Sequence, residues 1–233
     1  MLKPLPPTFP ATVSALQEVA TELVAPARNT SQEVGLEAAP GGFGTPFFEF
    51  EGVRRRVRVE GDALVHEYDG EERRAPLHSL ATAGAAITEL LPFDVQLSDE
   101  PLAVDATAAR ALGALYGFGT AVLGRLVEEA EEDDEASPVR LWPEHFDVAI
   151  ELGSEARGLR ANYGFSPGDE QHREPYLYVG PWSAPIDGGE LWNGHGFSGA
   201  ELAYSELIAA EDQAAAAAAF FGCHREALVA LAR

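Results

Sequence analysis

The sequence contains almost no cysteine and almost no lysine. Cys223 is the single cysteine among 233 residues, so no internal disulfide and no zinc site built on several thiolates can form. This composition favours a reducing compartment, and we expect the protein to be cytoplasmic. Lys3 is the only lysine, and the chain therefore has no P-loop lysine to contact nucleotide phosphates.

Positive charge is scarce throughout the chain. Asp and Glu total 38 residues against 16 Lys and Arg, which gives a formal net charge of −22. Such a surface repels phosphate backbones and anionic lipids, so we expect neither nucleic acid nor a membrane as a partner. The arginine-rich run VRRRVRVE alternates with valine as a strand does, and only alternate arginines of a strand share a face.

Long apolar runs and reaction motifs are also missing. The N-terminal MLKPLPPTFP has no apolar stretch long enough for a signal peptide or a membrane span. The chain has no HExxH helix and no CxxC pair, and GGFG at Gly41–Gly44 lacks the GxGxxG spacing. The sequence therefore names no reaction, and it leaves the oligomeric state open.

The hydrophobic content of 46% is enough for a sizeable core and predicts a folded globular protein. In the first half, apolar spacing predicts an amphipathic helix over residues 10–25. Two β-branched runs around Gly61-Asp62 predict a hairpin, followed by a short third strand in RRAPL and a helix over 77–91. The longest predicted helix covers 105–132, with Asp105 as its N-cap.

The second half repeats this outline. Residues 128–137 are mostly acidic and are predicted to be a solvated linker. The segments FDVAIELG, GLRANYGF and PYLYVGPW predict three strands, and an alanine-rich helix is expected over 211–233. We predict an α+β fold in which two antiparallel meanders pack against N-terminal, central and C-terminal helices. The chain is expected to form one compact domain over 1–233, or two similar halves over 1–127 and 138–233.

Aromatic, carboxylate and histidine residues crowd into the segment 139–197. In WPEHFD, His145 and Asp147 are two positions apart, so a continuous strand would place both on one face. That spacing suits two metal ligands, or a carboxylate that orients an imidazole for proton transfer. In the alternative interpretation, both residues lie on a solvated strand face while Phe146 and Val148 enter the core.

The turn SPGDEQHREP carries a second set of the same side chains, although structural loops commonly have this composition. If the strands form a meander, this loop and the first meet at one end of the sheet. One pocket could then hold a divalent transition metal, with a third imidazole from His195. The expected metal ligands are His145, Asp147, Asp169 and His172. The catalytic candidates are His145, Asp147 and His172. The expected ligand-binding residues are Trp142, Glu144, Asp147, Tyr163, Asp169, Glu174, Tyr176, Tyr178 and Trp182.

Two functions from different classes fit these residues. The first is binding of a small polar or cationic molecule in an aromatic- and carboxylate-lined pocket formed by 139–197. The second is a metal-assisted or acid/base hydrolase or isomerase, with His145 or His172 partnered by Asp147 or Asp169. Stoichiometric metal in the purified protein would favour the second, so whether the chain is an enzyme stays open at this point.

The motifs themselves resemble a bacterial family of cytosolic proteins of unknown function. The matching segments are LWPEHFDVAIELG, YGFSPGDE and EPYLYVGPW, which fit the patterns W-x-x-x-F-D-x-A, G-F-x-P-G-D and E-P-Y-x-Y-V. The resemblance extends upstream to GGFGTPFFEF and the hairpin, and so covers most of the chain. It implies a shared site and no activity, and some members lack the histidine that corresponds to His145. The implied site residues are Trp142, Phe146, Asp147, Asp169, Glu174, Tyr176 and Tyr178.

Overall fold

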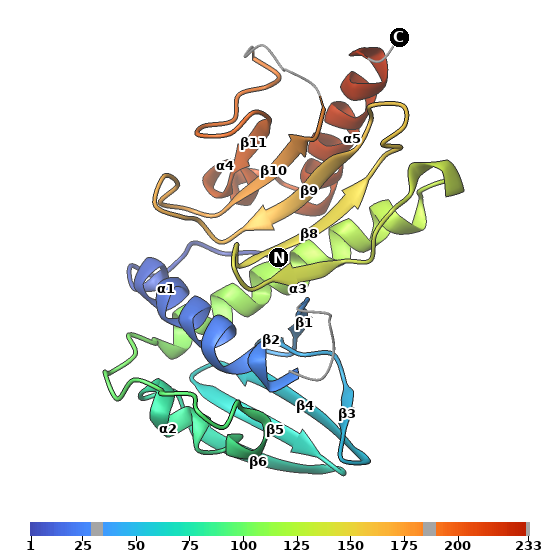
Figure 1. The fold of residues 1–233 in the computed structure, drawn as a ribbon. Coiled ribbons are helices and arrows are strands. Elements are labelled where there is room, and N and C mark those ends of the chain that lie inside the picture. The colour runs from blue at the N-terminus through green and yellow to red at the C-terminus, as the bar shows by residue number, and fades with distance from the viewer. Residues whose placement is uncertain (29–34, 184–189, 232–233) are drawn as a thin grey trace. The chain divides into compact units, whose positions relative to one another are not determined.

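The computed structural model describes residues 1–28, 35–183 and 190–231 (Figure 1). It confirms an α+β fold in which helices accompany two antiparallel sheets. The chain forms two compact units. The N-terminal unit comprises Leu5–Gly117 and Leu141–Phe146, and the C-terminal unit comprises Met1–Pro4, Phe118–Arg140 and Asp147–Arg233.

The N-terminal unit is built on a six-stranded sheet in the order β1-β2-β4-β5-β6, with β3 paired to β4. Its helices begin with α1 and end with the first half of α3, which continues into the other unit. The elements are α1 (Phe9–Val19), the π-helical η1 (Ala20–Val24), η2 (Pro26–Arg28), β1 (Glu37–Ala39), β2 (Gly42–Gly44), β3 (Phe48–Phe50), β4 (Val53–Glu60), β5 (Ala63–Tyr68), β6 (Glu71–Pro76), α2 (Leu80–Gly84), η3 (Thr88–Leu90) and α3 (Ala106–Glu128).

Turn chemistry explains the meander of this sheet. Strands β4 and β5 pair from Glu60 opposite Ala63, and the turn between them uses Gly61 at φ +62°. The next turn places Asp69 and Gly70 at φ +50° and +84°, a left-handed pair that suits a two-residue hairpin turn. The predicted hairpin and third strand are therefore confirmed.

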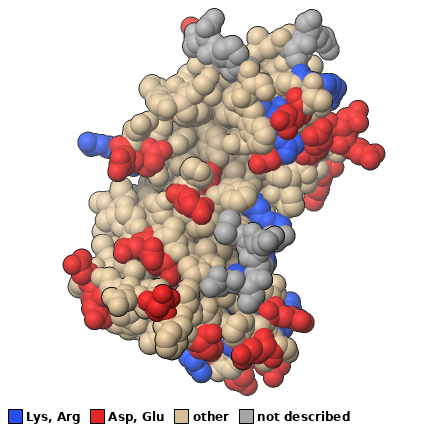
Figure 2. All heavy atoms as spheres, in the orientation of Figure 1, with Lys and Arg blue, Asp and Glu red and all other residues tan. Residues whose placement is uncertain are grey.

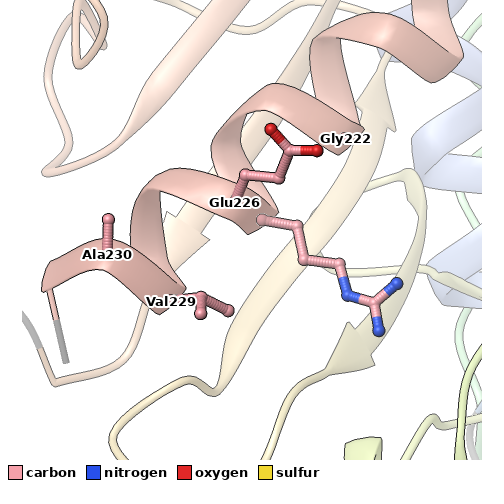
Figure 3. Close-up of a pocket in the computed structure, with 5 residues that line it drawn as sticks. Gly222, Glu226, Val229 and Ala230 are labelled. Carbon is pink, nitrogen blue, oxygen red and sulfur yellow. The ribbon is translucent and has the colours of Figure 1, made fainter. Parts of the chain in front are cut away.

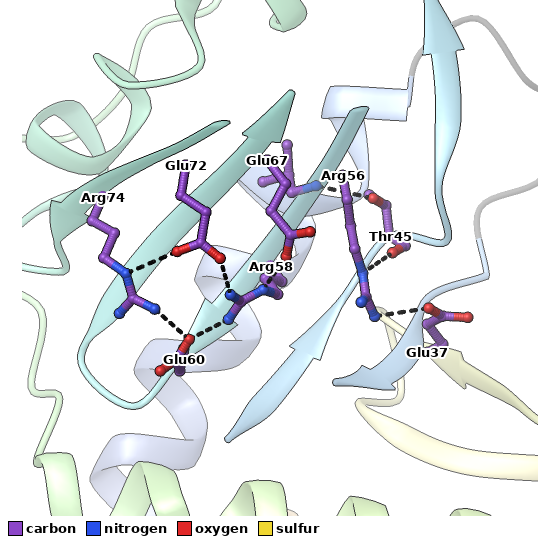
Figure 4. Close-up of polar contacts among 9 residues, drawn as sticks. Glu37, Thr45, Arg56, Arg58, Glu60, Glu67, Glu72 and Arg74 are labelled. Atoms are coloured by element: carbon purple, nitrogen blue, oxygen red, sulfur yellow. Dashed lines mark hydrogen bonds and ion pairs between the residues drawn. The ribbon is translucent and has the colours of Figure 1, made fainter. Parts of the chain in front are cut away.

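One face of this sheet is covered with paired charges (Figure 4). Arg58 lies at its centre with only 8% of its side chain exposed, and it contacts the carboxylates of Glu60, Glu67 and Glu72. Arg74 also contacts Glu60, at 2.6 Å. These contacts lower the pKa of Glu60, chiefly through the hydrogen bond from Arg58. In the VRRRVRVE run, Arg55, Arg56 and Arg58 thus contact carboxylates of the same unit, whereas Arg54 lies over the ring of Phe47.

Three aromatic rings fill the core of the N-terminal unit. Phe43 packs edge-on against Phe146 at 5.1 Å and against Tyr116 at 6.4 Å. The Tyr116 hydroxyl donates a hydrogen bond of 2.6 Å to the carbonyl oxygen of Phe146. Phe146 has φ +54°, which is rare outside glycine, and this packing and hydrogen bond hold it there.

The second sheet is five-stranded and antiparallel, in the order β11-β10-β9-β8-β7. The C-terminal unit contains β8 to β11 whole, but of β7 only its first residue, Arg140. Figure 1 shows α5 running alongside this sheet. The elements are η4 (Glu132–Asp134), β7 (Arg140–Trp142), β8 (Asp147–Leu152), β9 (Ala161–Ser166), β10 (Tyr176–Pro181), β11 (Ala200–Ala203), α4 (Tyr204–Ala209) and α5 (Gln213–Leu231).

Side chains alternate between the two faces of each strand, so one set of them packs in the core of this unit. Phe165 packs against Phe118 at 5.8 Å and against Phe221 of α5 at 5.6 Å, and Tyr163 joins Phe221 at 5.9 Å. By length and composition α5 is apolar enough to cross a membrane, with 22% of its most apolar window buried. Its Phe221 and Leu228 are almost fully buried in the unit, which accounts for part of that apolar composition.

Some predicted boundaries differ from the observed ones. The break between units falls at Gly117 inside α3, whereas the sequence suggested a division after residue 127. The acidic segment 128–137 belongs to the C-terminal unit, where the carbonyl of Asp134 accepts a hydrogen bond from Gly153. The helix predicted over 77–91 is two short pieces, α2 and η3. Asp105 does cap α3, by accepting hydrogen bonds from Thr107 and Ala108.

Candidate functional site

The polar face of the five-stranded sheet lies opposite its apolar core. Cross-strand register aligns Ala149 with Gly164, Gly164 with Tyr178, and Tyr178 with Glu201. Since side chains alternate along a strand, these positions share one face with the residues two places away. We call this set the polar face: Asp147, Ala149, Gly164, Tyr176, Tyr178 and Glu201.

The loop between β9 and β10 places Asp169 beside this face. One carboxylate oxygen of Asp169 accepts hydrogen bonds from the backbone N–H groups of Gln171 at 2.7 Å and His172 at 2.8 Å. Its other oxygen accepts from the hydroxyl of Tyr176 at 2.9 Å. Burial alone would raise the pKa of Asp169, but the hydrogen bonds from His172, Gln171 and Tyr176 outweigh it and lower that pKa. Asp169 is therefore held as a carboxylate.

His172 lies between two carboxylates. Its Nδ1 is 2.9 Å from Asp169 Oδ1, and its Nε2 is 3.0 Å from Glu201 Oε2. An ionised carboxylate only accepts hydrogen bonds, so both ring nitrogens can donate only when the ring is an imidazolium. The ring also stacks on Tyr176, with centroids 4.1 Å apart and a tilt of 31°. Two carboxylates and an aromatic ring thus surround the imidazole of His172.

Glu201 connects this arrangement to a second histidine. Its carboxylate, 14% exposed, accepts a hydrogen bond from the backbone N–H of His195 and is 2.6 Å from His195 Nδ1. Burial acts to raise the pKa of Glu201, but the contacts with His195 and His172 outweigh it and lower that pKa. We call Asp169, His172, Tyr176, Glu201 and His195 the imidazole–carboxylate cluster.

Aromatic rings border the cluster within the same unit. Phe197 lies 6.4 Å from Tyr176 and 6.3 Å from Tyr178 between ring centroids. The Tyr178 hydroxyl donates a hydrogen bond to Asp147, and the Tyr178 pKa is raised, first by burial and then by the charge of Asp147. This ring lies against Gly164, because a Cβ at that glycine would come within 2.5 Å of it. The glycine therefore makes room for the ring on the polar face.

The structure does not bring His145 into this cluster. The sequence argument required one continuous strand through His145 and Asp147, and this premise is wrong because β8 begins at Asp147 and Phe146 is left-handed. His145 is exposed in the preceding turn, which belongs to the N-terminal unit, as do Trp142 and Glu144. Asp147 is buried in the C-terminal unit.

Three other predicted ligand-binding residues make contacts within the fold and lie outside the cluster. Tyr163 is 1% exposed and packs on Phe221, so it faces the core rather than the polar face, and burial raises its pKa to about 12. Glu174 accepts hydrogen bonds from the backbone and hydroxyl of Ser205 at the start of α4. Trp182 is exposed and donates a hydrogen bond of 2.9 Å to Asn162.

The predicted metal site requires several His, Asp or Glu side chains that converge on one point. Within residues 1–28, 35–183 and 190–231, no group of three or more His, Cys, Asp or Glu side chains is arranged to hold a metal ion. His172 and Asp169 do meet, but both nitrogens of His172 already face carboxylates.

A pocket of about 450 Å³ lies elsewhere in the unit (Figure 3). Its lining contains none of the predicted site residues, so it is separate from the cluster. The lining residues are Gly222, Arg225, Glu226, Val229 and Ala230, all on α5.

Sequence reasoning singled out Asp169, His172, Tyr176 and Tyr178, which the structure brings together, and noted His195. It missed Glu201 and Phe197. Glu201 lies on the four-residue β11, and only the pairing register with β10 shows that it is opposite Tyr178. A sequence signal for this contact is weak, because such a short strand has little alternation.

Comparisons with protein-family models, with curated proteins and with solved structures gave no match. The motif resemblance to a bacterial family therefore stays a prediction from the sequence, and the function has to be argued from the geometry of the cluster.

Proposed function

We propose that the C-terminal unit binds a small polar or cationic molecule at the imidazole–carboxylate cluster and the neighbouring rings of the polar face. The observation that carries this proposal is the setting of His172. Two carboxylates and the ring of Tyr176 surround one imidazole group there. The same chemistry suits an organic cation, because carboxylates and aromatic faces are the groups that recognise ammonium ions.

The electrostatics of the chain support a cation over an anion. The net charge of −22 attracts cations and repels anions over a distance of about one Debye length. In the view of Figure 2, acidic side chains are spread over the surface while Lys and Arg gather at few places. Both carboxylates of the cluster have lowered pKa values and stay charged at neutral pH.

Phe197 supplies the accessible apolar side of the proposed site. It is partly exposed and lies next to both tyrosines of the polar face. A methylated ammonium ion could contact this ring while its charge lies near Glu201. Asp169 has more protein partners than Glu201, since two backbone N–H groups and Tyr176 also donate to it. We therefore assign the ligand charge to Glu201.

Binding of tetramethylammonium, followed by NMR shifts of the Tyr176 and Phe197 rings, tests the proposal. We expect saturable shifts that uncharged tert-butanol, of similar size, does not produce. Glu201→Gln is expected to weaken binding about tenfold, which corresponds to loss of one charge contact. Glu206→Gln removes the same charge from an exposed site on α4 and serves as the control. Equal shifts with tert-butanol, or equal weakening in both variants, would contradict the proposal.

Acid/base catalysis is a second candidate function. The pairing of His172 with Asp169 at 2.9 Å favours it, because a carboxylate commonly orients a catalytic imidazole. However, the other nitrogen of His172 faces Glu201, and the side chain is only 11% exposed. His172 can exchange a proton with a ligand only after one of these contacts breaks. The predicted catalytic residue is thus poorly accessible.

A further inference from the structure

His195 is the histidine in which an exposed ring contacts a half-buried carboxylate, that of Glu201. The side chain of His195 is 77% exposed and that of Glu201 is 14% exposed. Of the other five histidines, His66 and His224 are buried, and His172 contacts carboxylates at both ring nitrogens. His78 and His145 are exposed without a carboxylate contact in the described part of the chain.

The contact with Glu201 fixes the position of the proton on the His195 ring. Nδ1 is 2.6 Å from Glu201 Oε1, and the carboxylate is held in its ionised form by its lowered pKa. Nδ1 must therefore carry the hydrogen, because an ionised carboxylate only accepts. In the neutral ring this leaves the lone pair on Nε2, on an exposed side chain.

The surrounding contacts hold this pair in place. Glu201 Oε2 accepts from the backbone N–H of His195 at 3.0 Å and lies 3.0 Å from His172 Nε2. Asn193 binds the main chain of Glu201 twice, by donating to its carbonyl at 3.1 Å and accepting from its N–H at 2.9 Å. The orientation of Glu201 toward His195 thus does not depend on the histidine alone.

The chain path next to His195 also depends on glycine. Gly196 has φ +79°, and a Cβ there would come within 1.7 Å of the side chain of Gln171. Gly194 donates its backbone N–H to Gly199 at 2.9 Å, which closes the loop that carries His195. The loop that carries His195 is therefore held by contacts on both sides of this residue.

We propose that His195 and Glu201 form a proton-transfer dyad for general acid/base catalysis on a neutral or cationic small molecule. Nε2 of His195 takes a proton from an O–H or C–H group of the ligand, which keeps the electron pair of the broken bond. The imidazolium that forms is stabilised by Glu201. Return of the proton to the product or to water restores the neutral ring, so no further reactant is required. An anionic substrate would be repelled by Asp169 and Glu201.

The first test is the tautomer of His195, measured by nitrogen-15 NMR of the neutral ring. We expect a proton on Nδ1 in the wild-type protein, whereas free histidine prefers Nε2. Glu201→Ala should return His195 to the ordinary Nε2–H form, and the matched Glu206→Ala variant should leave it unchanged. A wild-type His195 protonated at Nε2 would overturn the dyad. This measurement needs no ligand, so its outcome is independent of the proposed cation binding.

The second test is the reactivity of Nε2 toward diethyl pyrocarbonate, followed by peptide mass spectrometry. In this reaction Nε2 bonds to a carbonyl carbon, ethyl carbonate leaves with the electron pair, and the Nδ1 proton is released. Above the pH at which the rings titrate, we expect His195 to react several times faster than the exposed His78 and His145. The advantage should disappear in Glu201→Ala, with folding checked by circular dichroism. Equal rates at the three histidines in the wild-type protein would refute the inference.

Discussion

The two sheets carry different kinds of charge on their polar faces. In the N-terminal unit, the carboxylates of Glu60, Glu67 and Glu72 meet Arg58, whose guanidinium is charged at every accessible pH (Figure 4). In the C-terminal unit, the carboxylates of Asp169 and Glu201 meet the imidazole groups of His172 and His195.

This difference separates a structural network from a candidate site within one acidic chain. The guanidinium of Arg58 directs its nitrogens at three carboxylates and leaves no group that exchanges protons near neutral pH. The imidazole–carboxylate cluster instead ends in an exposed ring, that of His195. We therefore expect substitutions in the Arg58 network to change mainly the free energy of unfolding. Substitutions in the imidazole–carboxylate cluster should change mainly ligand binding and proton transfer.

The largest expected effect comes from removal of Arg58. Arg58→Met keeps much of the side-chain volume but leaves three carboxylates close together without their shared counter-charge. Because Arg58 is nearly buried and its partners are partly solvated, we expect a loss of about 3 kcal/mol in the free energy of unfolding, at the lower end for broken buried pairs. Urea unfolding measures it, followed by the fluorescence of Trp142 in a background with Trp182→Phe and Trp192→Phe.

Arg74→Met provides the control for that experiment. Arg74 belongs to the same network, but 47% of its side chain is exposed, so solvent screens its contacts with Glu60 and Glu72. We expect a clearly smaller change than for Arg58→Met. If the two variants lose equal stability, the network is a surface feature and the contrast between the two faces does not hold.

The next effect concerns the fit between Gly164 and Tyr178. A Cβ at Gly164 would lie 2.5 Å from the Tyr178 ring, so Gly164→Ala must displace this ring and its hydrogen bond to Asp147. We expect a loss of about 2 kcal/mol, typical of overpacking, together with altered NMR shifts at Tyr176 and Phe197. Gly180→Ala on the neighbouring strand is the matched control, since no atom lies within 4 Å of the added Cβ. Equal effects of the two substitutions would show that the polar face is not closely packed.

Local turn and cap chemistry allowed much of the fold to be predicted from the sequence. Gly61-Asp62 and Asp69-Gly70 supply the backbone conformations of tight turns, and Asp105 supplies a helix cap, so the meander and the start of α3 could be located. The predicted helix over 77–91 was too long because short 3₁₀ pieces and turns have the same composition as a helix. Local signals therefore fixed the element types better than their lengths.

The candidate site could be predicted only in part, because it depends on contacts between distant segments. Asp169 and His172 are three residues apart in one loop, and their proximity follows from local structure. The pairing of β10 with β11 brings Glu201 to His172, and no local sequence pattern predicts this pairing. The left-handed Phe146 is equally unpredictable, since aromatic residues rarely adopt this conformation and only tertiary packing stabilises it here.

The smallest expected effect is a pH dependence of the free energy of unfolding, which arises from His66 in the N-terminal unit. His66 is fully buried, and its pKa is lowered by burial, while Glu89 raises it and Arg55 and Arg73 lower it. The unfolded chain binds a proton at His66 below its ordinary pKa of about 6.5, whereas the folded chain resists protonation until a lower pH. The unfolded state thus holds more protons in this window, and stability must fall as the pH decreases through it.

Unfolding of wild type and His66→Phe in urea at several pH values between neutral and mildly acidic tests this dependence. In a background with Trp182→Phe and Trp192→Phe, Trp142 alone reports, and it belongs to the N-terminal unit. We expect the wild-type midpoint to fall more on acidification than that of His66→Phe, while His78→Phe, an exposed control, follows the wild type. Parallel falls in wild type and His66→Phe would show that His66 stays neutral in both states or titrates equally in both. The response of the N-terminal unit to mild acid would then have to come from other groups, and Glu60 would respond late because its contacts with Arg58 and Arg74 lower its pKa.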